Sequence, residues 1–314
     1  MSKLKCKAMT IDGKDIGTWG LKLSEGSLSE WLKLPKRKTA DYNNWAESDG
    51  IEPDLSTVEW EETKIGLQFI LQGSTMQEYA QNYRSLLSTL SDKGAREISA
   101  YGLTRKLRMD QCTAYDRGNT YLEQGKGMGS IAVSLYEEEP EIYESIPDNG
   151  ISLRGYYAIN GYDLADFGIG GECEDEEILR YPGMKTPFTD GNEYDLSTMV
   201  TKHKDVKLSF WWMAETMDDF IRNRMALLWQ LSRTGTLDLY IKSVGGTVAA
   251  YYTECTSFEA SIYAGGRVGA RMTLSFTIPV VSWVDAGGTS MYRVLLDNDL
   301  GLLADENGNV IVFN

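Results

Sequence analysis

The sequence is poor in the residues that most enzymes use for nucleophilic, acid–base or metal chemistry. It has one histidine, His203, and four cysteines in 314 residues, and no two cysteines form a CxxC pair. His203 lies in a polar stretch that we interpret as an exposed turn or a strand start, so we expect no Ser-His-Asp relay there. A zinc site needs several His or Cys ligands. We therefore predict no catalytic residue, no metal site and no cofactor, and we expect a protein that is not an enzyme.

The four cysteines are also too few for a disulfide scaffold in a chain of this length. Acidic residues are plentiful, so paired-carboxylate chemistry stays open on composition alone, because a sequence does not show which carboxylates are buried. The acidic runs at 137–139 and 172–177 fall in apparent loops, and we interpret them as solvated. The stretches 297–299 and 305–309 lack the spacing of an EF-hand and are better interpreted as hairpin turns.

Basic charge and long apolar runs are both scarce. There are 31 Lys and Arg against 46 Asp and Glu, which gives a net charge of −15. This balance disfavours specific nucleic-acid binding and attachment to an anionic membrane. The one basic run, at 33–38, is interpreted as a solvated loop. No stretch has the length of a membrane span or the pattern of a secretion signal, so we expect a soluble protein made in a reducing cytoplasm.

The sequence does contain a repeat. The segment Ile11–Leu21 reappears as Ile159–Ile169, including an Asp-Gly or Asn-Gly pair that suits a turn with positive φ. Trp19 with Leu21, and Phe167 with Ile169, are the expected core anchors. Further matches are Glu30-Trp31-Leu32-Lys33-Leu34-Pro35 with Glu177-Ile178-Leu179-Arg180-Tyr181-Pro182, Asp54-Leu55-Ser56-Thr57 with Asp195-Leu196-Ser197-Thr198, Leu86-Leu87 with Leu227-Leu228, and Cys112 and Tyr115 with Cys255 and Phe258.

The repeat predicts two similar domains, at 1–146 and 147–281, and a C-terminal extension at 282–314. The acidic, turn-rich stretch 137–150 is interpreted as the linker. Because Cys112 and Cys255 are equivalent, each is expected to be a small buried residue. The first copy has a longer loop after Pro35 than the second has after Pro182. That loop, with Tyr42 and Trp45, either reaches a neighbouring molecule or is a mobile surface loop.

Each copy has one clear helical pattern, and the rest alternates like β-strands. A capping box at 74–77 precedes the apolar stripe of the first helix, and Thr216 precedes the second. Strands are expected at 65–71, 206–212, 237–241, 248–252, 255–260 and 272–278, with glycines at 265–269 joining the last two. The extension has three short strand patterns, with an Asn307-Gly308 hairpin turn. We predict an α+β, mainly β fold: two tandem β-sandwich or partial-barrel domains, each with one packed helix, and a C-terminal β-meander.

The second copy resembles the tube-forming domain of phage distal tail proteins, part of the tail-tube superfamily. The resemblance rests on the order of Ile159-Asn160-Gly161, Phe167-Gly168, Tyr181-Pro182-Gly183, Asp190-Gly191, the helix with Leu227-Leu228-Trp229, and Leu274-Ser275-Phe276-Thr277-Ile278-Pro279. It covers about 120 residues and recurs more loosely in the first copy. The tandem duplication departs from many distal tail proteins and is similar to a hub protein with two tube domains.

This resemblance implies a structural component of a phage or prophage tail, in the virion, that acts by self-association into a ring. Two domains per chain would let three chains supply a pseudo-sixfold ring, and a hexamer of chains is the other possibility. The resemblance also implies contacts with neighbouring tail proteins. The alternative is a carbohydrate-binding or adhesion module, because Tyr and Trp on a β-sandwich can stack on sugars.

Overall fold

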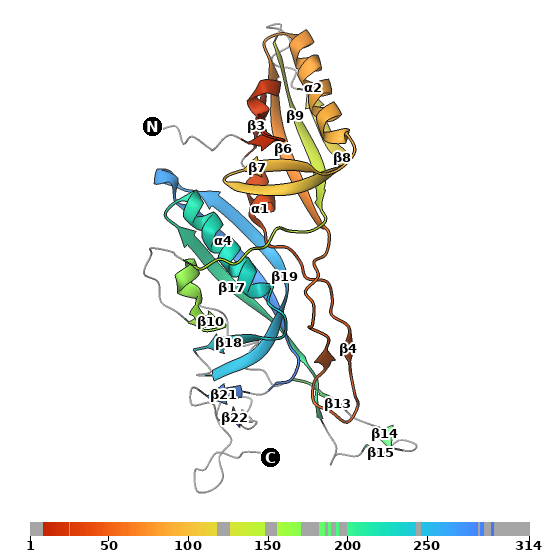
Figure 1. Ribbon diagram of the computed structural model, residues 1–314, viewed down its shortest axis with the longest axis vertical. Helices are drawn as coiled ribbons and strands as arrows, with labels where there is room; N and C mark the ends of the chain where they lie inside the picture. The colour runs from red at the N-terminus through yellow and green to blue at the C-terminus, as the bar shows by residue number, and fades with distance from the viewer. Residues whose placement is uncertain are drawn as a thin grey trace.

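The structure is a computed structural model that describes residues 9–24, 26–117, 126–147, 156–170, 182–185, 188–189, 193–194, 200–242, 246–281, 283–285 and 290–291. Within these residues the chain forms two curled antiparallel β-sheets that follow one another along the sequence, each with an α-helix packed on it (Figure 1). The short helix α1 lies between the two sheets in this view. The predicted α+β, mainly β fold with two β-rich units is confirmed.

The first sheet has seven strands in the order β2-β1-β7-β8-β9-β6-β3 among the described residues. The strands are β1 (Thr10–Ile11), β2 (Lys14–Asp15), β3 (Leu21–Leu23), β6 (Thr63–Gly73), β7 (Arg96–Ala100), β8 (Leu103–Arg117) and β9 (Gly127–Glu137). The helices are η1 (Ile16–Trp19), α1 (Ser27–Leu32) and α2 (Met76–Ser91). We call the residues from β1 to β9 the first unit.

The second sheet has the order β11-β10-β18-β19-β20-β17-β12, with β21 pairing with β19, and β22 with β21. The elements are β10 (Tyr157–Ile159), β11 (Tyr162–Asp163), η3 (Leu164–Phe167), β12 (Ile169–Gly170), β17 (Lys204–Ala214), α4 (Met217–Leu231), β18 (Leu237–Ile241), β19 (Gly246–Ile262), η5 (Ala264–Gly266), β20 (Val268–Ile278), β21 (Trp283–Asp285) and β22 (Ser290–Met291). We call the residues from β10 to β20 the second unit.

Small two-stranded ladders extend from both units at the lower end of Figure 1. In the first unit, β4 (Tyr42–Asn43) pairs with β5 (Glu52–Pro53). In the second, β13 (Met184–Lys185) pairs with β16 (Val200–Thr201), and β14 (Phe188–Thr189) with β15 (Glu193–Tyr194). We call residues 36–60, which contain β4 and β5, the arm.

The two sheets have the same strand order once β1 is matched with β10, β6 with β17, and β7 to β9 with β18 to β20. The match extends to irregularities. β8 has register shifts after Met109 and after Cys112, and β19 has them after Tyr252 and after Cys255. Bulges are specific features of a strand, so two in matching places make β8 and β19 structural equivalents.

The repeated hairpin turn has the predicted backbone conformation. Asp12 and Gly13 have φ of 50° and 74°, and Asn160 and Gly161 have φ of 52° and 81°. Two successive residues with positive φ form the turn that best joins twisted antiparallel strands. The expected anchors that follow it, Trp19, Leu21, Phe167 and Ile169, are all buried.

Both predicted helices are present, and each begins after a threonine cap. Thr216 accepts a hydrogen bond from the Asp219 amide, as expected. In the first unit the cap is Thr75, which accepts from the Glu78 amide, while the Glu78 carboxylate accepts from the Ser74 amide. The capping box therefore spans 75–78, one residue later than predicted, because Glu78 supplies the acidic partner that such a box needs.

One strand prediction needs correction, and the strands predicted for the extension lie outside the described residues. The patterns at 248–252 and 255–260 belong to one continuous strand, β19, because its bulges break the alternation without ending the pairing. The glycines at 265–266 lie in the turn between β19 and β20, as predicted. The expected meander strands from Tyr292 onward, with Asn307-Gly308, lie outside the described residues.

Candidate interaction surfaces

Two buried arginines, one from each unit, converge on the end of α1. Arg224 of α4 donates to the main-chain oxygens of Leu32 at 2.7 Å and Lys33 at 2.9 Å. Arg105 of β8 donates to the main-chain oxygens of Trp31 at 2.8 Å and Lys33 at 3.3 Å. The last carbonyls of a helix lack partners inside the helix and carry partial negative charge, so cations suit this position. The two arginines therefore fix α1 to both units at once.

The electrostatic cost of this arrangement is offset by one carboxylate. Glu137, the last residue of β9, is buried and forms a 2.6 Å ion pair with Arg105. Burial, and then the positive charge of Arg105, lower the pKa of Arg224 to about 9, which still leaves it protonated at neutral pH. Our prediction that Glu137 is solvated was wrong. A run of three glutamates does not show from sequence which of them pairs with a buried arginine.

The segment after α1 covers one edge of β19 in the second unit. The Arg37 amide donates to the Thr253 carbonyl at 2.8 Å, and Tyr252 donates its hydroxyl proton to the Pro35 carbonyl at 2.8 Å. Within α1, the Ser29 hydroxyl accepts from the Ala260 amide at 2.9 Å. An edge strand with free backbone groups invites pairing, and here that edge is occupied by the same chain.

The basic run at 33–38 is part of this contact and is not a fully solvated loop. Leu34 and Arg37 are buried, while Lys36 and Lys38 extend outward and pair with glutamates of the arm or its flank. Trp31 and Leu32 just before it have no exposed surface. The Trp31 side chain packs within the first unit, where its indole nitrogen donates to the Ala100 carbonyl at 3.0 Å.

The hairpin loop of the arm, between β4 and β5, is fastened to the second unit. Asp49 accepts from both the amide and the hydroxyl of Thr201, and Gly50 donates its amide proton to the Thr201 carbonyl. Lys185 donates to three main-chain oxygens of the arm, those of Trp45, Ser48 and Gly50. The loop predicted to reach a neighbour or to be mobile is therefore held by its own chain. Tyr42 and Trp45 nevertheless remain about half exposed, at 50% and 49%.

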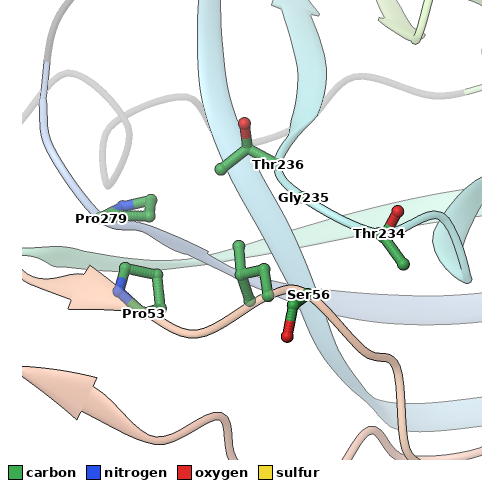
Figure 2. A pocket seen from close by; sticks show the side chains of 7 residues that line it. Pro53, Ser56, Thr234, Gly235, Thr236 and Pro279 are labelled. Carbon is green, nitrogen blue, oxygen red and sulfur yellow. The ribbon is translucent and has the colours of Figure 1, made fainter.

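A shallow groove of about 480 Å³ lies where the arm meets the second unit (Figure 2). It is lined by Pro53, Leu55 and Ser56 of the arm, by the turn 234–236 after α4, and by Pro279. The Gly235 amide donates to the Leu55 carbonyl across its floor. None of the described residues that line the groove has an ionisable side chain, so none of them can act as a general acid or base.

The stretches 172–177, 297–299 and 305–309 lie outside the described residues, and the other residues considered for chemistry stay apart in the structure. His203 is partly exposed beside the start of β17, and its ring lies 6.4 Å from that of Tyr42. Cys255 is buried as expected, but Cys112 is only half-buried, and both are free thiols. Among the described residues no group of three or more His, Cys, Asp and Glu side chains is placed to hold a metal. In the same part of the chain, no helix is long and apolar enough to cross a membrane.

The outer face of the second sheet carries an exposed aromatic group that the sequence did not single out. Trp211 of β17 is 48% exposed and lies under the Arg271 guanidinium, 4.0 Å from the ring centre. Met213 is 42% exposed on the same strand. Alternation along β17, with apolar residues at every second position, is the signal that places both on the outer face.

No family model matches the chain, and no curated protein matches it. Among solved structures it is similar to the SPP1 Dit protein, which is described as a paradigm of the hub adsorption apparatus in phages that infect Gram-positive bacteria. The two chains share 13% identity over 86% of this chain and 97% of that one, with a TM-score of 0.29. A similarity of this size carries no functional argument by itself.

Proposed function

We propose that this chain is a structural component of a phage or prophage tail, of the distal-tail, hub or tube-like kind. In this proposal it consists of two tandem copies of one tube-like domain, 1–146 and 147–281, with an extension at 282–314. It is made in the cytoplasm of the bacterial host and ends in the virion tail. It acts by assembly, with no turnover, no cofactor and no specific nucleic-acid or membrane binding.

The observation that supports the proposal most is the repetition of one unit down to the paired bulges of β8 and β19. A unit that recurs with the same strand order is suited to building a ring, because equivalent units make equivalent contacts. The net charge of −15 agrees with a protein that does not grip DNA. The exposed aromatic side chains at the arm tip, Tyr42 and Trp45, suit contacts with neighbouring tail proteins.

Two ring compositions fit this proposal. Three chains would supply six units in a pseudo-sixfold ring, and six chains would supply twelve units in one wide ring or two stacked rings. Mass measurement of the assembled protein by light scattering separates a trimer from a hexamer.

Phage or prophage particles purified from the host bacteria provide a direct test of the tail assignment. We expect gold-labelled antibodies against the chain to mark one position on the tail, and mass spectrometry of purified particles to find the chain among the virion proteins. Labelling that is absent from particles, with the chain present only in the cell lysate, would remove the proposal.

The alternative function, a carbohydrate-binding or adhesion module, is favoured by one observation, the exposed ring of Trp211. Indole rings stack on sugars, although here Arg271 already lies over one face of the ring. A glycan array decides between the two functions. Binding that is lost in Trp211→Ala supports the alternative, and an array without binding removes it.

A further inference from the structure

The distal part of the arm is held to the second unit by hydrogen bonds, with little apolar packing. We call residues 41–54, which contain β4, β5 and the loop between them, the strap. The structure describes all of the strap, and of its apolar side chains only that of Ile51 is buried. Every residue from Asp41 to Glu47 is exposed. A segment with few buried apolar contacts opens locally at a free energy well below that of global unfolding.

The root of the arm, in contrast, is fixed in place. Arg37 is buried there, and beside it the Lys38 amide donates to the Glu59 carbonyl at 2.9 Å. At the start of the strap, the Asp54 amide donates to the Asp41 carbonyl at 2.7 Å, which joins the two sides of the hairpin. The strap is therefore a hairpin with its own backbone bonds, and it leaves from a root that is anchored independently.

Lys185 of β13 closes the strap onto the second unit. Its ammonium donates to the main-chain oxygens of Trp45 at 2.8 Å, Ser48 at 2.8 Å and Gly50 at 2.5 Å. An ammonium carries three N–H donors and no acceptor, so the three carbonyls satisfy it completely. Hydrogen bonds from a charged donor are stronger than those between neutral groups. The loop of the strap therefore forms a cup of carbonyl oxygens that recognises one cationic donor.

The strand beside Lys185 completes the contact. β13 pairs with β16, where Thr201 lies opposite Met184. The Asp49 carboxylate accepts from the Thr201 amide at 2.6 Å and from its hydroxyl at 2.7 Å, and the Gly50 amide donates to the Thr201 carbonyl at 2.7 Å. One small ladder of the second unit therefore makes both contacts with the strap.

We propose that the strap is a conformational device with two states, and that the Lys185 ammonium is the switch between them. In the closed state, which is the one described above, the strap joins the two units at a second place, away from the buried arginines at α1. In the open state, residues 41–54 leave β13 and β16, and the exposed side chains of Tyr42 and Trp45 move with them. The device does not depend on a tail role, because all of its parts lie within one chain.

Removal of the ammonium tests the switch. In Lys185→Ala, amide hydrogen exchange across the strap should become faster by about tenfold or more, while exchange in α2 stays unchanged. The control is Lys202→Ala, which removes the same charge from an exposed lysine directly after β16 and should leave exchange in the strap unchanged. Both variants are measured as full chains, and circular dichroism checks that they fold.

Chemical rescue separates hydrogen bonding from a general effect of charge. The n-propylammonium ion replaces the side-chain atoms that Lys185→Ala removes, so it should restore slow exchange in the strap of this variant. Tetramethylammonium carries the same charge but has no N–H donor, so at the same concentration it should not. A side chain needed only for packing or for net charge would not give this difference.

The aspartate of the strap gives an independent test. Asp49→Ala removes the acceptor of the two Thr201 bonds and should speed exchange across the same residues as Lys185→Ala. The control is Asp41→Ala, because Asp41 is an exposed aspartate of the same hairpin and should have no such effect.

Three results would each overturn the proposal. They are equal exchange in Lys185→Ala and Lys202→Ala, faster exchange that spreads over both units, and the absence of a difference between the two ammonium ions. If the strap opens as expected but the chain is absent from phage particles, the device stands and the tail role falls. If the chain is found in particles but Lys185→Ala leaves exchange in the strap unchanged, the tail role stands without the device.

Discussion

Arg224 on α4 donates a 2.7 Å hydrogen bond to the main-chain oxygen of Leu32, a residue 192 positions earlier in the chain. This bond joins the helix of the second unit to the end of α1 in the first. With the matching bonds from Arg105, it sets the two units in one orientation. In the proposed ring, this relationship would give the two units of one chain a defined step.

The first prediction concerns that arginine. Arg224→Ala removes donors from the buried carbonyls of Leu32 and Lys33 and leaves a cavity, so unfolding should require about 2–4 kcal/mol less free energy. The control is Arg222→Ala on the same helix, where the exposed ion pair with Asp219 is worth under about 1 kcal/mol. Thermal and urea unfolding measure both. Equal effects of the two substitutions would contradict the role of Arg224 in the contact between the two units.

The second prediction concerns the buried ion pair. Glu137→Gln leaves Arg105 buried without its carboxylate partner, and breaking such a pair costs about 3–5 kcal/mol. The neighbouring Glu138 forms an exposed pair with Arg108, so Glu138→Gln should cost less than about 1 kcal/mol. Urea unfolding compares them. A small effect at Glu137 would show that water or another group compensates Arg105.

The third prediction follows from the buried thiol of Cys255, whose pKa is raised, mainly by burial, from 9.0 to about 11. Below pH 9 the thiol is protonated in both the folded and unfolded states. Between pH 9 and 11 the unfolded state loses the proton more readily than the folded state, so wild-type stability should fall by roughly 3 kcal/mol at most relative to Cys255→Ala. Unfolding of both proteins from pH 8 to pH 11 measures this difference. A constant difference across that range would show that the folded thiol ionises normally.

The fourth prediction concerns the attachment of the arm. Gly50 has a φ of +67°, and a Cβ placed there would lie 1.8 Å from the Pro279 carbonyl oxygen. Gly50→Ala should therefore detach the hairpin loop of the arm and speed amide hydrogen exchange across 36–60. Gly13→Ala is the matched control, because Gly13 also has positive φ but has open space at its Cβ position. If the two variants had the same effect and neither changed exchange specifically in the arm, backbone strain alone would explain both, and the prediction would be wrong.

Much of the fold could be predicted from the sequence because its signals are local. Asp12-Gly13 and Asn160-Gly161 specify their turns by residue type, and the spacing of Leu86, Leu90 and their matches specifies the helices. Alternation located β6 and β17. The paired bulges could not be predicted. Thr253 and Thr256 interrupt the alternation of apolar and polar residues, and the same kind of interruption also occurs where a strand ends.

The seam between the units could not be predicted, because it depends on contacts between distant residues. Arg37, Arg224 and Glu137 are charged, and charged side chains are usually exposed, so composition argues against their burial. The long arm was recognised as an insertion, but its attachment depends on hydrogen bonds between residues far apart in the chain, such as Gly50 with Thr201 and Ile51 with Pro279. The difference in burial between Tyr115 and its match Phe258 is likewise visible only in the structure.

Cryo-electron microscopy of the purified, assembled protein tests the central claim most directly. We expect a closed ring of three or six chains in which first and second units alternate. A stable monomer under all assembly conditions, or an oligomer that does not close around a central hole, would contradict it.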